Sequence, residues 1–155
     1  MSVVAKSETT AELTLQTGDF WPDINVADFR VKGRVPTIVD DRAALYFLER
    51  AFIVFLDDVA DYEEKQKARG YAQLKDVQTP KIADRNRQEI LFESAIFAYA
   101  KKLICDDYKD IDLARKTGQD KTKEIEGSEE AWNAEYIKAV RMFLEIGRAS
   151  CRERV

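Results

Sequence analysis

The chain has 155 residues, 45% of them hydrophobic and 35% charged, which suits one globular domain with its own core. Its formal net charge of −4, from 25 basic and 29 acidic residues, argues against broad nucleic-acid binding through phosphate contacts. No apolar run approaches the roughly 20 residues that span a bilayer, and the first residues lack the pattern of a signal peptide. We therefore expect a protein that is cytosolic or is assembled from the cytosol.

Residues 1–17 are rich in Ser, Thr and small residues, which predicts a flexible N-terminal arm. Within this arm, Leu13 and Leu15 alternate with polar neighbours, a pattern typical of a short strand over 12–16. Such a strand is not stable alone, so we expect any order there to come from a neighbouring segment.

The next segment, DFWPDINVADFRVKG, covers residues 19–33. The proline favours an extended residue before it, and Asn25 is a good N-cap for a short helix over 26–32. The large apolar residues here are Phe20, Trp21 and Ile24. They are either a hydrophobic staple on the domain's own core or a clasp onto another subunit, because aromatic residues favour both environments.

The strongest periodicity predicts one long helix over 41–69, capped by Asp40 and closed by Gly70. Its apolar stripe recurs in steps of three and four residues. The stripe comprises Ala44, Leu48, Ala51, Phe52, Phe55, Val59 and Tyr62. The turn 52–56 is apolar all round, so we expect burial on more than one side, with cover that a second subunit could supply. A kink near Asp57–Asp58 is the alternative to a straight helix of about 43 Å.

A connector with a turn at Thr79–Pro80 leads to a second helix over 85–106. Asp106 and Asp107 should end it, because acidic residues are unfavourable at the negative pole of a helix. The charged stretch 109–127 predicts a loop, and Ser128 caps a last helix over 128–145, unless that helix begins further back, near Asp120. We therefore expect an all-α fold, a small bundle of about four helices with one long central helix.

The sequence offers little for catalysis. It has no histidine, and Cys105 lies in an apolar helical run that favours packing over chemistry. Pairs of adjacent carboxylates occur at Asp57–Asp58, Glu63–Glu64 and Asp106–Asp107. Adjacent residues on a helix do not face each other, so these pairs suit a solvated face, and 106–118 matches no register of a calcium loop. We predict no catalytic residue, no metal and no cofactor, and an interaction protein in place of an enzyme.

Several short motifs follow one another along the chain, and their order is more specific for a protein family than any single motif is. They are Phe20-Trp21-Pro22-Asp23-Ile24, Gly70-Tyr71, Leu74-x-Asp76-Val77, Glu93 with Ala95, Tyr108 with Asp112, and Trp132 with Ala139 and Val140. This order resembles the head completion (stabilisation) protein family, GPL, of peduovirus-type contractile-tailed phages. The resemblance covers roughly residues 18–145, which we take as one helical head-completion domain.

The resemblance implies a structural virion protein with a connector- or adaptor-like fold of the kind that forms a ring under a portal. After DNA packaging, copies would bind the portal vertex, stabilise the filled capsid and prepare tail attachment. The implied partners are the portal protein, other copies in a dodecameric ring, and tail-completion or neck proteins. Packaged DNA would pass without sequence-specific binding, and no membrane would take part.

The implied location is the head–tail neck of the virion, reached from the host cytoplasm during assembly. The alternative is a helical protein-binding or regulatory module with no part in virus assembly. For the subunit or portal interface we single out a set of mainly aromatic residues, the predicted interface set. It comprises Phe20, Trp21, Pro22, Asp23, Ile24, Phe52, Phe55 and Trp132.

The last ten residues, IGRASCRERV (146–155), differ from the acidic, periodic sequence before them. They contain three arginines and no apolar stripe. With common codons they back-translate into a widely used sequencing-library adapter, so we interpret 146–155 as an artefact of the sequence record. We still expect a helical continuation there, because Arg and Ala are good helix formers, with Cys151 exposed and Cys105 shielded.

Overall fold

The computed structural model describes residues 13–115 and 119–152. Within this part the chain is mainly helical, with two small antiparallel strand pairs, which confirms the all-α prediction. The helices are α1 (Val26–Lys32), α2 (Asp41–Asp58), α3 (Tyr62–Ala68), α4 (Arg87–Arg115) and α5 (Gln119–Arg152), with a 3₁₀ turn at Leu74–Asp76. None of the described helices has the length and apolar composition that crossing a bilayer requires.

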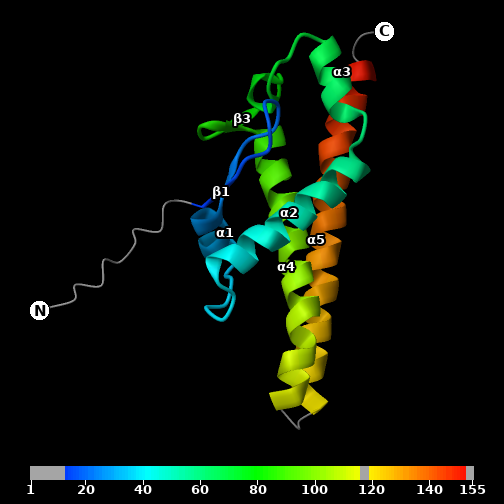
Figure 1. Cartoon of the computed structure of the whole chain (residues 1–155). Helices are drawn as coiled ribbons and strands as arrows, with labels where there is room; N and C mark the ends of the chain where they lie inside the picture. Colours follow the sequence, from blue (N-terminus) through cyan, green and yellow to red (C-terminus); the bar gives the residue numbers. More distant parts are fainter. Residues whose placement is uncertain (1–12, 116–118, 153–155) are drawn as a thin grey trace, which may run out of the picture.

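The scaffold of the molecule is a long antiparallel hairpin of α4 and α5 (Figure 1). Helix α2 crosses this hairpin near its middle, and α1 lies on the side of α2 away from α5 (Figure 1). The end of the hairpin at which α4 stops and α5 begins extends beyond the other elements (Figure 1). One half of the hairpin therefore carries the core, and the other half projects from it.

The strand predicted at 12–16 is confirmed over β1 (Thr14–Leu15), which pairs with β2 (Ile24–Asn25). As expected, its order comes from a neighbour, since Leu15 lies opposite Ile24 and the Val26 amide donates to the Leu13 carbonyl at 2.9 Å. Residues 1–12 of the flexible arm predicted at 1–17 lie outside the described residues.

Helix α1 begins and ends where its local signals predict. The Asn25 side chain accepts hydrogen bonds from the amides of Ala27 and Asp28, and Gly33 is the C-cap. Arg30 then joins α1 to the start of α2, through an ion pair with Asp41 and a hydrogen bond to the carbonyl of Val39. These contacts set the direction in which α2 leaves the turn.

The single helix predicted over 41–69 is wrong, because α2 ends at Asp58 and α3 begins at Tyr62. The last turn of α2 has no basic residue, and Asp57 and Asp58 lie at its negative pole. The break lies next to the kink considered at Asp57–Asp58, and it lets Val59 and Tyr62 both reach the core. Gly70 then follows α3 with φ +94, a conformation that favours glycine.

Helix α4 continues past its predicted end at 106, and α5 begins at Gln119, which agrees with the alternative start near Asp120. The loop predicted at 109–127 is therefore wrong apart from 116–118, which lie outside the described residues. Asp106 and Asp107 do not end α4, because both are exposed and α5 packs along it. The start of α4 is set by Asn86, whose side-chain oxygen accepts from the Glu89 amide at 2.8 Å.

A second hairpin, β3 (Lys81–Ile82) with β4 (Arg85–Asn86), lies in the predicted connector. Its turn holds Ala83 at φ +55, a position where no glycine signals a turn, and the sequence therefore did not predict it. Glu93 accepts from both Lys32 and Arg85 at 2.7 Å, which ties α1 and this hairpin to α4.

Candidate interaction surface

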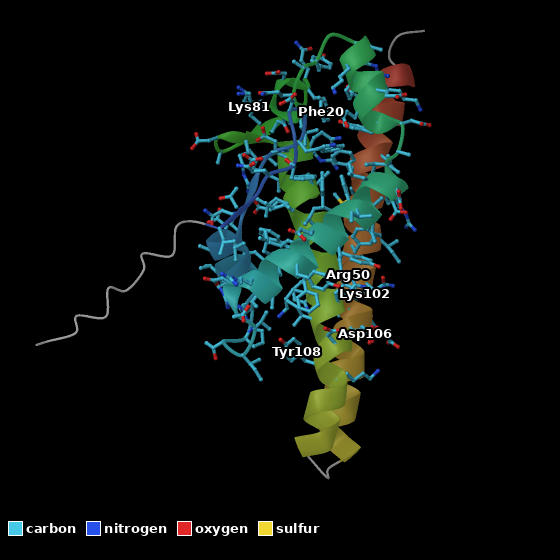
Figure 2. The ribbon with its side chains drawn as sticks, viewed as in Figure 1. Phe20, Arg50, Lys81, Lys102, Asp106 and Tyr108 are labelled. Carbon is cyan, nitrogen blue, oxygen red and sulfur yellow. The ribbon has the colours of Figure 1, made fainter. Side chains whose placement is uncertain are left out.

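The predicted interface set begins with Trp21, which lies at the centre of the core and is only 4% exposed. Its ring contacts Phe20, Phe55, Tyr62, Phe92 and Phe143, with centroids between 4.9 and 6.0 Å away. Phe20 precedes β2, and the other four rings come from α2, α3, α4 and α5. Trp21 therefore joins four helices, and its neighbour Phe20, labelled in Figure 2, contacts it edge to face.

The backbone around Trp21 is fixed by short-range polar contacts. The Thr17 hydroxyl lies 2.7 Å from the Trp21 carbonyl, to which it donates, and the Thr17 amide donates to Asp23. The Leu74 amide donates to the Phe20 carbonyl at 2.9 Å. Residues 20–24 were interpreted either as a hydrophobic staple on the chain's own core or as a clasp onto another subunit. In the structure they occupy the position of the staple.

The predicted interface set divides into core and surface residues. Phe20, Trp21, Ile24 and Phe55 are buried by the chain's own helices. Pro22, Phe52 and Trp132 are half-buried and Asp23 is exposed. A surface hollow is lined by Gly18, Asp19, Phe20, Trp21, Pro22, Asp23, Gln73, Lys75 and Glu89. The interface role of the set stays a prediction. Its half-buried and exposed members, Pro22, Phe52, Trp132 and Asp23, have side-chain surface that a partner could contact.

Gln88 is a core residue that sequence reasoning missed. It is fully buried at the start of α4, and its Nε2 donates to the Tyr62 hydroxyl at 2.9 Å and to the Phe143 carbonyl at 3.1 Å. It thereby links α3, α4 and α5, and burial raises the pKa of Tyr62. The signal in the sequence was its position four residues before Phe92, on the apolar stripe of α4.

Lys101 is a second polar residue whose burial was not predicted, with 8% exposure on α4. Its Nζ donates to the Arg34 carbonyl at 3.2 Å and lies 5.6 Å from the centroid of the Trp132 ring. Burial lowers the pKa of Lys101, since the charged amine has lost most of its water. Half-buried Cys105 lies one turn later, and burial raises the pKa of its thiol, which disfavours the reactive thiolate.

The adjacent carboxylates do not form acid–base pairs. Asp58 accepts a hydrogen bond from Tyr136, and Glu63 forms an ion pair with Lys67. Asp106 and Asp107 are exposed on α4, where Figure 2 shows Asp106 near Tyr108 and toward the projecting end of the hairpin. In the described part of the chain, no three Cys, Asp or Glu residues are grouped so that they could hold a metal ion.

Large apolar side chains are exposed on several elements. They are Val31 (78%), Ile38 (54%), Tyr46 (52%), Ile53 (59%), Ile82 (55%) and Ile137 (47%). Ile53 belongs to the turn 52–56, which was expected to be buried on more than one side. In the single chain Ile53 is exposed, and its neighbours Phe52 and Val54 are only half-buried. This outer side of α2 therefore has the apolar surface that suits a contact with another protein.

Residues 15–153 match the sequence model of a family described as phage head completion protein (GPL). The matched range includes the folded core and continues past residue 145 into the C-terminal tail. No curated protein and no solved structure matches the chain.

Proposed function

The chain belongs to the phage head completion protein (GPL) family, and from this premise we propose that it binds the portal vertex after DNA packaging, stabilises the filled capsid and prepares it for tail attachment. The family is one of structural proteins in head assembly, so the protein is associated with the virion and interacts with other phage head or tail proteins. The finer steps, portal binding and neck formation, are our proposal.

The observation that carries this proposal beyond family membership is surface that the chain's own core leaves uncovered. Tyr46 and Ile53 on α2 and Ile137 on α5 are about half exposed, although they lie on helices that also build the core. Exposed apolar residues on rigid helices suit a subunit of a permanent assembly. The half of the α4–α5 hairpin that projects from the core offers a further helical element for docking (Figure 1).

We propose that the assembly is a dodecameric ring on the portal, within the head–tail neck, and that tail-completion or neck proteins bind its other side. DNA would pass through this ring without sequence-specific contacts. The formal net charge of −4 supports such a channel, since a negatively charged wall repels the phosphate backbone.

The direct test mixes the purified chain with purified portal and follows complex formation by light scattering and negative-stain imaging. We expect a ring on one face of the portal, with twelve copies by native mass spectrometry. A chain that stays monomeric and never binds portal would favour the helical regulatory module instead.

Genome retention supplies a second test. DNA-filled heads made without the protein should lose DNA to nuclease, and adding the purified chain should restore protection. Equal protection with and without the protein would contradict a role in stabilising the filled head.

A further inference from the structure

We propose that the outer face of α2 in one copy packs in parallel against the outer face of α5 in the next copy, with Ile53 opposite Ile137. This inference rests on the ring of the proposed function and identifies the two surfaces that close it. The partner is a second copy of this chain.

The two faces point away from a common core. On α2, Tyr46 and Ile53 are seven residues apart and lie on the side opposite Phe55. On α5, Ile137 lies well away from Phe143, and the rings of Phe55 and Phe143 meet inside at 5.4 Å between centroids. One copy therefore offers two different surfaces, which is the requirement for a head-to-tail contact that can close into a ring.

Charges flank each isoleucine at matching distances. Asp57 follows Ile53 by four residues and Arg141 follows Ile137 by four, so both lie about 6 Å along the helix from the apolar contact. With the helices parallel and the isoleucines opposed, Asp57 meets Arg141. Both side chains are exposed, and neither has an ion-pair partner in the described part of its own chain.

The other end of the contact is also complementary. Tyr46 precedes Ile53 by seven residues, and Glu130 precedes Ile137 by seven. Glu130 would therefore meet the Tyr46 ring beside Arg50, whose guanidinium carbon lies 5.5 Å from that ring's centroid. Figure 2 shows Arg50 where α2 crosses the hairpin.

The charges also select the direction of the contact. Reversing one helix about the Ile53–Ile137 contact would place Asp57 level with Asn133, which offers no charge, and Arg141 level with Glu49. The parallel arrangement is thus the one in which both charged positions gain a partner.

Charge reversal with rescue tests this inference on the full-length chain mixed with portal. Asp57→Arg and Arg141→Asp should each weaken assembly of the ring by about tenfold or more, and the double variant should recover to within a few-fold of the original. Single variants that assemble normally, or a double variant no better than the singles, would overturn the inference. Asp106→Arg is the matched control, since it makes the same charge change at an exposed site on α4.

The failures of the two proposals are distinguishable. If the original chain forms the ring and the reversals have no effect, the chosen faces are wrong and the proposed function stands. If the original chain forms no ring, both the proposed ring and the proposed contact are rejected. If circular dichroism shows that a charge-reversal variant does not fold, a cysteine variant tests the contact instead. It carries Ile53→Cys and Ile137→Cys together with Cys105→Ser and Cys151→Ser. Oxidation of the ring on the portal should form a disulfide between position 53 of one copy and position 137 of the next, and absence of linked copies would reject the contact.

Discussion

The hydroxyl of Tyr136 on α5 donates a 2.5 Å hydrogen bond to Oδ2 of Asp58, the last residue of α2. This contact fixes the end of α2 on the hairpin at the point where the chain turns toward α3. Burial, together with the bond to Asp58, raises the pKa of Tyr136, because both disfavour the phenolate.

Tyr136→Phe should lower the free energy of unfolding at pH 7 by about 1 kcal/mol, the usual loss for one hydrogen bond. Because the folded-state pKa of Tyr136 lies above its unfolded value, the contribution is fully present below about pH 10 and is lost as the pH rises further. The difference in stability between the original chain and the variant, measured in urea, should therefore shrink above pH 10. A difference that stays constant to pH 11 would contradict the assignment.

Lys101 should show the opposite dependence on pH. Its folded-state pKa is lowered by burial, so the folded chain gives up this proton before the unfolded chain does. Stability relative to Lys101→Met should rise as the pH increases toward the usual lysine pKa of about 10.4. The measurement is urea unfolding of both chains between pH 7 and 10.5, and a falling or flat difference would show that the amine is well solvated.

Trp21→Ala should cost on the order of 3–5 kcal/mol, because it leaves a large cavity among the surrounding rings. The loss should occur in the isolated chain, without any ring or portal, as a lower midpoint of urea or thermal unfolding. Trp21→Phe is the matched control and should cost less, since the indole Nε1 has no hydrogen-bond partner among the described residues. Unchanged stability in the alanine variant would show that the cluster does not support the core.

Mass spectrometry can test whether residues 146–155 belong to the protein. Helix α5 continues to Arg152, which is the helical continuation expected from its composition. We expect protein purified from virions to lack a C-terminal peptide ending in CRERV. Detection of that peptide would show that 146–155 are genuine and would return Cys151 to consideration.

The features that the sequence alone determined are those that depend on neighbours along the chain. Asn25 caps α1 through amides two and three residues away, so its role could be predicted from spacing. The apolar stripe of residues 44–55 likewise predicted the buried face of α2, because periods of three and four residues place side chains on one side of a helix. The order of motifs along the chain also predicted the family, because that order is a property of the sequence and needs no contact in space.

Tertiary structure alone decided where helices break or continue and which polar groups are buried. The chain turns between Asp58 and Tyr62 because the turn brings Val59 and Tyr62 into the core, while α4 passes through Asp106 because α5 packs along it. Gln88 and Lys101 are buried because carbonyls and a hydroxyl from distant segments accept their hydrogen bonds. Such partners are up to 67 residues away in sequence, so local patterns contain no sign of them, and burial against them outweighs local preference.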